Sequence, residues 1–407
     1  MDAYDPATRE AEKRELTKPT KKINTRVLEA RASHLRRGMP CSIPQFQYDR
    51  ATRGSAMGGM NYYIEVRFDD GIRWIARICG FNATSPPAAL QDHVTQSDVA
   101  ILMHLEQTDI PAPKVYHFVL EHPRNAVGVD FILIEKLPGK SLRWPTAARE
   151  QMEVMNQLAD RFVELHKYPF DLRGSLDSLS EYYVGTFARE SLVNFEQPQM
   201  RITGPFSSLE EYHISSLRLS LDLILCEEIY SQQAVDAYLI HVYLIDLVPL
   251  VLLSTQDNEK FYPRHADDKG DDILVDQHFN ATEITDWELA ATASPSHAID
   301  SPIGFQPVAD FSSGKDNLGD DEIVFASLLE GMGRQDLANF VWGGRLQHRF
   351  AFCCGYDLAD WGGFLGLFRG RRDAIVADEY LGWNEWKIAA LQRYRDDSGL
   401  QQLLSKL

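Results

Sequence analysis

The chain has 407 residues, of which 44% are hydrophobic and 25% are charged, a composition that is typical of a folded globular protein and excludes a disordered one. This length suits one large bilobal domain or about two to three small ones. A formal net charge of −18 disfavours nucleic acid and anionic membranes as partners. Five cysteines with no CxxC spacing favour reduced thiols in a cytoplasmic protein without a zinc site.

Two segments bear on the location of the protein. Residues 1–22 lack the apolar core of a signal peptide, and residues 23–37 have apolar side chains at helical spacing. The apolar run at 237–254 contains His241, Asp246 and Pro249. Because a membrane-spanning helix needs about 20 mostly apolar residues, we expect a buried core helix here and no membrane partner.

The first third of the chain predicts a small sheet with one helix. Two aromatic and β-branched runs around an Asp-Asp-Gly turn predict a β-hairpin, and Pro138-Gly139 closes the region. The expected strands are 61–68, 72–79, 114–121 and 130–137, and the expected helix is 90–107.

After residue 139 the pattern becomes mostly helical, with two short strands at 272–275 and 283–287. The long helices are expected at 147–167, 208–227 and 229–254. This order predicts an α+β fold with a small antiparallel-sheet lobe and a larger helical lobe. We expect a helical extension at 1–44, the sheet lobe at 45–138 and the helical lobe at 139–407.

The stretch from Phe261 to Ala290 carries the strongest chemical signal. It reads HADDKGDD at 265–272, then the apolar strand ILV, and then DWE at 286–288. Two strands joined by a short turn would bring the second group of carboxylates beside the first. Crowded carboxylates need cations to remain ionised, and Mg²⁺ prefers such oxygen ligands. A solvated acidic turn is the alternative interpretation of the composition alone.

The same stretch resembles the catalytic signature of the aminoglycoside phosphotransferase family, in which HxDxxxxN is followed by a short strand and DW(D/E). The hairpin GGMNYYIEVRFDDGIRWIARI, the runs IPAPKVY and FILIEKLPG, and the later GSL and GRLQHRFAF resemble the family as well, the last two its fungal members. The resemblance covers residues 45 to 370 approximately. It implies a protein-kinase-like bilobal fold and ATP- and Mg²⁺-dependent transfer of a phosphoryl group to a small molecule.

The resemblance implies roles for the residues of the acidic stretch. Asp267 would orient or deprotonate the substrate hydroxyl, and His265 would be the structural histidine of the catalytic loop. Asp272, Asp286 and Glu288 would form the metal site.

The resemblance also implies the residues that contact the nucleotide. Arg77 lies where a lysine contacts the phosphates, and Asp98 lies where a glutamate pairs with that lysine. The backbone near Glu135 and Leu137 would meet the adenine. The implied cofactor-binding set is Gly59, Asn61, Arg77, Asp98, Glu135 and Leu137.

Three positions depart from the family pattern and leave alternatives open. Asp272 replaces an asparagine and adds negative charge beside the ATP phosphates, Arg77 replaces a lysine, and Asp98 replaces a glutamate. An ATP-dependent small-molecule kinase is the first interpretation. A kinase-fold enzyme that works without ATP in small-molecule biosynthesis, or a degenerate pseudokinase or binding protein, are the others. The acceptor and the oligomeric state are left open.

Overall fold

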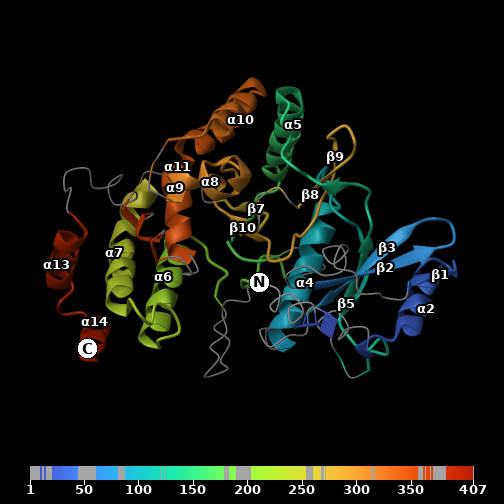
Figure 1. Ribbon diagram of the computed structural model, residues 1–407, viewed down its shortest axis with the longest axis horizontal. Coiled ribbons are helices and arrows are strands. Elements are labelled where there is room, and N and C mark those ends of the chain that lie inside the picture. The colour runs from blue at the N-terminus through green and yellow to red at the C-terminus, as the bar shows by residue number, and fades with distance from the viewer. Residues whose placement is uncertain are drawn as a thin grey trace.

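The computed structural model describes residues 10–11, 13–14, 21–44, 61–80, 88–120, 122, 124–177, 183–188, 203–253, 260–266, 270, 272–312, 315, 317–355, 361–362, 364–366, 368–369 and 382–406. A five-stranded sheet lies at one end of the molecule, and a group of helices lies at the other (Figure 1). We call these two parts the sheet lobe and the helical lobe. The predicted α+β class, with a small antiparallel-sheet lobe and a larger helical lobe, is confirmed.

The sheet lobe contains the predicted hairpin. Its turn places Gly71 at a φ of +88°, a left-handed conformation that glycine adopts without steric cost. The strands pair antiparallel in the order β1-β2-β3-β5-β4. They are β1 (Cys41–Ser42), β2 (Asn61–Phe68), β3 (Arg73–Cys79), β4 (Val115–Val119) and β5 (Phe131–Glu135).

Two helices accompany this sheet. Helix α2 (Thr25–Leu35) buries Leu28 and Ala32 in the same apolar cluster as β2 and β3, and β1 extends the sheet by pairing with β2. Residues 25–42 are therefore part of the layers of the sheet lobe. Helix α4 (Ala88–Leu105) packs Val99 and Leu105 in a second cluster that includes Ile132 and Ile134 of β5. The domain boundaries at residues 44 and 138 stay a prediction.

The helical lobe holds two small β-structures among its helices. Strands β6 (Lys140–Ser141), β8 (Ile273–Val275) and β9 (Ala281–Ile284) form one sheet, and β7 (Tyr262–Arg264) pairs with β10 (Ala291–Ala293). The described helices are α5 (Ala148–Leu165), α6 (Leu209–Leu225), α7 (Ala234–Leu253), α8 (Pro295–Ala298), η3 (Ile303–Phe305), α9 (Val308–Ser312), α10 (Asp320–Gly331), α11 (Gln335–Gly355), α13 (Trp383–Arg393) and α14 (Ser398–Leu404).

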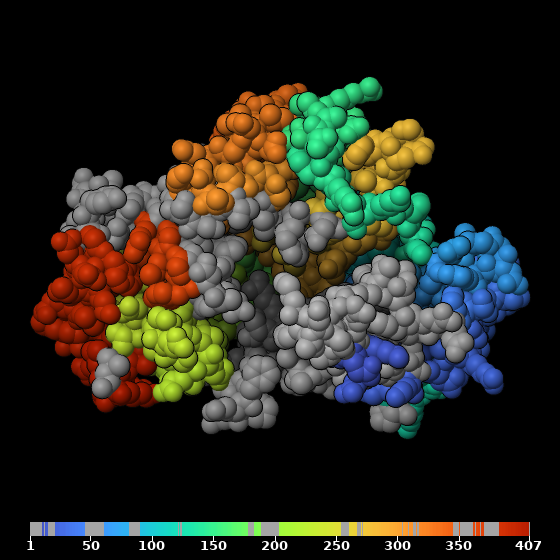
Figure 2. Space-filling model, in the orientation of Figure 1, coloured from blue at the N-terminus to red at the C-terminus, as the bar shows by residue number. Residues whose placement is uncertain are grey.

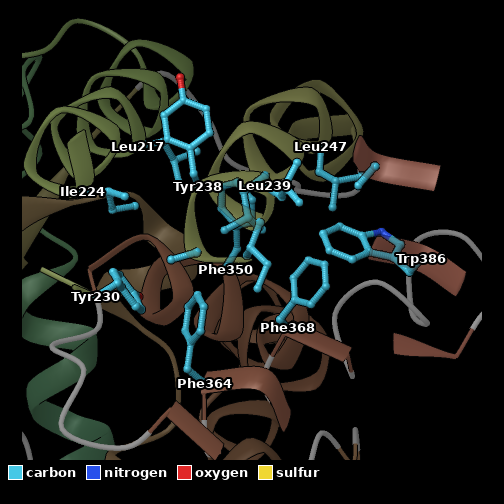
Figure 3. Packing of buried hydrophobic residues seen from close by; sticks show 14 of the residues in the cluster. Leu217, Ile224, Tyr230, Tyr238, Leu239, Leu247, Phe350, Phe364, Phe368 and Trp386 are labelled. Atoms are coloured by element: carbon cyan, nitrogen blue, oxygen red, sulfur yellow. The ribbon is translucent and has the colours of Figure 1, made fainter. Parts of the chain in front are cut away.

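Helix α7 forms the centre of the largest core cluster. Its buried residues include Leu239, Leu244 and Val248, and Phe364 and Phe368 belong to the same cluster (Figure 3). By length and composition α7 could cross a membrane, and 50% of its most apolar stretch is buried inside the protein. The half of this stretch that is buried packs in the core cluster, whereas Leu250 and Leu253 are exposed.

A short link joins the two lobes. Strand β5 ends at Glu135 in the first sheet, and β6 begins at Lys140 and pairs with β8 in the helical lobe. Residues 136–139 therefore span the lobes, and the chain then continues into α5. Figure 2 shows α5, in green, next to α10, in orange, at the top of the view. At Gly139, with φ of +147°, a Cβ atom would lie 2.5 Å from Thr282 Oγ1 and 2.8 Å from Leu274 Cβ. A larger residue does not fit there without displacing the β8–β9 hairpin.

Candidate active site

A cavity of about 460 Å³ lies between the sheet lobe and the β8–β9 hairpin. We call it the interlobe cavity. Its volume is within the range of about 300–1,000 Å³ that is usual for small-molecule sites. Five of the residues predicted from the sequence line it, namely Arg77, Glu135, Leu137, Asp272 and Asp286.

A buried ion pair forms the cationic end of this cavity. The guanidinium of Arg77 on β3 pairs with the carboxylate of Asp98 on α4, and their side chains are only 6% and 1% exposed. The charge of a buried arginine must be compensated, and Asp98 does this from the helix behind the strand. The pair thus fixes Arg77 at the wall of the interlobe cavity.

A second polar contact joins the lobes. Asn61 Nδ2 at the start of β2 donates a hydrogen bond to Glu288 Oε2 at 2.6 Å. Tyr63, two residues further along β2, is directly opposite Arg77 in the hairpin and also lines the cavity. Burial raises the pKa of the Tyr63 phenol; the Arg77 charge opposes this, whereas the charges of Asp286 and Glu288 add to it. Asn61 and Glu288 therefore lie at the same site as the cavity residues.

The histidine of the acidic loop ties that loop to the strand that follows. The His265 ring Nε2 donates to the backbone O of Thr285 at 2.8 Å and lies 3.6 Å from Asp272 Oδ2. The Thr285 backbone N and its Oγ1 both donate to the Asp272 carbonyl O, at 2.8 and 2.9 Å. The role of His265 as the structural histidine of the loop stays a prediction, and these contacts connect it to Thr285 and Asp272. The predicted Asp267 and Gly59 lie outside the described residues.

The DWE turn has an unusual backbone. Asp286 adopts a φ of +62°, a conformation that non-glycine residues other than Asn and Asp seldom take. The neighbouring Trp287 is 1% exposed, and its Nε1 donates to the Ile284 O at 3.0 Å. The buried indole anchors the turn, and the Asp286 side chain is exposed at the cavity wall. Backbone strain of this kind concentrates at functional sites.

The carboxylates suit Mg²⁺ in number and kind. Asp272 and Asp286 line the same cavity, and Mg²⁺ is commonly held by one or two carboxylates together with substrate phosphates. Among the described residues, no group of three or more His, Cys, Asp or Glu side chains is placed to hold a metal by itself. The assignment of Asp272, Asp286 and Glu288 to a metal site stays a prediction.

Tyr63 and Glu283 are among the residues of the interlobe cavity that were not predicted from the sequence. Tyr63 could have been found, because the hairpin register places it opposite Arg77. Glu283 on β9 gave no such signal, since its burial depends on how the lobes pack. It is 4% exposed and lines the interlobe cavity together with Glu135. Burial, and then the charge of Glu135, raises the pKa of Glu283 to about 7.

We expect Glu283→Gln to stabilise the protein above neutral pH. The pKa of Glu283 is higher in the folded than in the unfolded state, so the native protein binds the extra proton between about pH 4.5 and 7. The stabilisation from that proton is fully present below pH 4.5 and is lost as the pH rises through 7. At pH 8 the variant should gain about 3 kcal/mol at most. Urea denaturation from pH 4.5 to 8 measures this, and equal pH profiles for both proteins would contradict it.

Comparisons with known proteins do not assign this chain to a family. No family model matches the chain. Two subtelomeric hrmA-associated cluster proteins of Aspergillus fumigatus are similar to parts of it. One is 27% identical over 171 residues, which are 41% of this chain and 31% of the relative. The other is 30% identical over 125 residues, 30% of this chain and 23% of the relative. The matches thus span less than a third of either relative.

Several solved structures overlap with most of the chain at low identity. A putative aminoglycoside phosphotransferase from Ralstonia eutropha is 15% identical with a TM-score of 0.48, covering 93% of this chain and 98% of its own. A putative fructosamine-3-kinase from Thermobifida fusca is 14% identical with a TM-score of 0.45, covering 85% and 97%. An ethanolamine kinase of Plasmodium vivax is 12% identical with a TM-score of 0.44, covering 88% and 83%. Overlaps as coarse as these transfer neither a site nor a substrate.

Proposed function

We propose that this protein is an ATP- and Mg²⁺-dependent phosphotransferase that acts on a hydroxyl group of a small molecule. One observation carries the proposal: the interlobe cavity combines the buried Arg77–Asp98 pair on one side with the carboxylates of Asp272 and Asp286 on the other. A nucleoside triphosphate needs both a cation for its phosphates and oxygen ligands for its metal.

The shape of the cavity supports a nucleotide as its occupant. The apolar side chains of Ile75, Ile134 and Leu274 line it near the interlobe link, where a flat base would be sandwiched. Arg77 and Asp286 line it as well and would meet the phosphates and the metal. The resemblance to aminoglycoside phosphotransferases implies the same placement.

In this proposal each residue of the candidate site has a defined role. Asp267 accepts the proton of the acceptor hydroxyl, and His265 holds the loop that carries it. Arg77 binds phosphate oxygens, and Asp98 keeps its guanidinium in place. Asp272 and Asp286 would hold Mg²⁺, which supplies positive charge that neutralises the transferred phosphoryl group. Catalysis would then be mostly positioning and charge neutralisation.

We expect ATP to raise the melting temperature of the protein only when Mg²⁺ is present. A ligand that binds the native state alone stabilises it by about 2.7 kcal/mol at a hundredfold excess over its Kd. Thermal denaturation with ATP and Mg²⁺, with ATP and EDTA, and with Mg²⁺ alone measures this directly. The absence of a shift at millimolar ATP would refute the proposal.

One observation favours a second candidate function, an enzyme of the same fold that works without ATP. Glu283 has a pKa of about 7 inside the interlobe cavity, which suits a general acid or base near neutral pH. If ATP fails to bind, acid–base chemistry on a small molecule at Glu283 becomes the leading candidate.

A further inference from the structure

A second cavity lies in the helical lobe beside Asp272. Its volume is about 210 Å³, and it lies between α5, the segment 297–305 and residues 264, 265, 270, 272 and 273. The interlobe cavity and this second cavity share two lining residues, Asp272 and Trp287. The two cavities therefore meet at Asp272, which the proposed function places at the phosphoryl-transfer site, and at the buried Trp287 beside Asp286.

The second cavity is mostly apolar and aromatic. Phe162 of α5 and Phe305 of η3 line it, and Trp144 lies at its outer part, 38% exposed and 5.1 Å from Phe305 between ring centroids. A dry cavity of about 150 Å³ in another protein holds benzene. The second cavity can therefore hold a molecule with one ring and a substituent.

One cation in its wall, Arg161, forms no ion pair with a carboxylate in the part of the chain that the structure describes. Arg161 of α5 lines the cavity, and its Nη2 donates to the Ala281 carbonyl O at 3.3 Å. Its Nη1 is shielded from solvent and has no hydrogen-bond partner within the described part of the chain. Burial lowers the pKa of Arg161 to about 10, with only the neighbouring Asp160 acting against this.

Two carboxylates, Asp272 and Asp300, also line the second cavity, and neither of them pairs with Arg161. Asp300 Oδ1 accepts a hydrogen bond from Ser301 N at 2.7 Å, and Asp272 Oδ1 accepts one from Gly270 N at 3.0 Å. The carboxylate that raises the pKa of Arg161 is that of Asp160, which is not part of this wall. A buried guanidinium without a counter-ion is unfavourable, and an anion that enters the cavity would supply one.

We propose that the second cavity binds a compact, one-ring or similarly small apolar molecule that carries a carboxylate or another anionic group, with Arg161 as its counter-ion. Resting on the proposed function, this molecule is the acceptor of the phosphoryl group, because the cavity meets the interlobe cavity at Asp272 and Trp287.

The experiment compares benzoate with its uncharged analogue benzamide as probes of the purified protein. We expect benzoate, and not benzamide, to raise the melting temperature and to change the tryptophan fluorescence, since Trp144 lies beside the cavity. In Arg161→Met, benzoate should bind about tenfold to a hundredfold more weakly, which is the usual loss when a hydrogen bond to a charged group is removed. Arg149→Met, an exposed arginine on the same helix, should bind benzoate as the original protein does.

Other readouts separate this inference from a structural role and from the proposed function. If Arg161 contributes only to packing, Arg161→Met should lower the melting temperature of the protein without ligand. We expect this melting temperature to be unchanged or raised, because the substitution removes a buried charge. Equal binding of benzoate and benzamide, or full binding of benzoate by Arg161→Met, would overturn the inference. A shift with Mg²⁺ and ATP but none with benzoate would leave the phosphotransferase standing and refute this site. Benzoate binding without any shift of the melting temperature by ATP would support this site and refute the phosphotransferase.

Discussion

Replacing Arg77 with methionine is expected to lower the free energy of unfolding by about 3–5 kcal/mol. The change removes one partner of a buried pair and leaves the Asp98 carboxylate without a counter-charge, in a side chain that is 1% exposed. Chemical denaturation measures the loss. The stabilisation by ATP and Mg²⁺ should vanish in the same variant, because the arginine that would bind the phosphates is gone.

A double variant separates the two effects. Arg77→Met together with Asp98→Leu replaces the pair by apolar groups, so most of the stability should return, whereas nucleotide binding should not. Arg73→Met is the matched control on the same strand. Arg73 is half-exposed and pairs with Glu65 at the surface, so its loss should cost less than about 1 kcal/mol. A double variant as unstable as Arg77→Met would show that the ion pair is not the cause.

Asp286→Asn is expected to abolish the Mg²⁺-dependent stabilisation by ATP and to reduce phosphotransfer by about two to three orders of magnitude. The substitution removes a charge at the cavity wall and little else. Asparagine tolerates the left-handed backbone conformation that Asp286 adopts, with φ of +62°, so the turn should keep its geometry. The melting temperature without ligand should therefore stay unchanged.

The control for this prediction is Asp69→Asn, in the exposed turn of the β2–β3 hairpin. It removes the same charge far from the cavity and should leave nucleotide binding intact. Titration of each variant with Mg²⁺ at fixed ATP, followed by thermal denaturation, gives the comparison. If Asp286→Asn retains the full Mg²⁺-dependent shift, Asp286 is not a metal ligand.

The elements that the sequence predicts best are those whose evidence is local. The β2–β3 hairpin follows from alternating side chains around a turn with Gly71, and α7 follows from its continuous apolar run. The pairing of Arg77 with Asp98 followed from the family resemblance, and the structure brings the two side chains together. Short strands such as β7 and β10 carried no such pattern, because three residues do not establish a periodicity.

The parts of the site that could not be predicted depend on packing between distant segments. Glu283 and Glu135 lie close together only because β9 packs near the link between the lobes. Arg161 is shielded from solvent only because α5 packs against the segments that line the second cavity. From the sequence alone, a carboxylate or guanidinium on an amphipathic element is interpreted as a solvent-exposed group, because its burial is not known. The positive φ of Asp286 is likewise a property of the folded turn.

The short link between the lobes has a consequence for how ligands bind. Only residues 136–139 separate the first sheet from β6. This short link keeps the two walls of the interlobe cavity close together, so each wall has a high effective concentration with respect to the other. Closing a short, constrained connection costs little chain entropy, so the energy of a ligand held by both walls goes into affinity rather than into bringing the lobes together. Lengthening the link beside Gly139 would therefore weaken a two-walled ligand while leaving each wall intact.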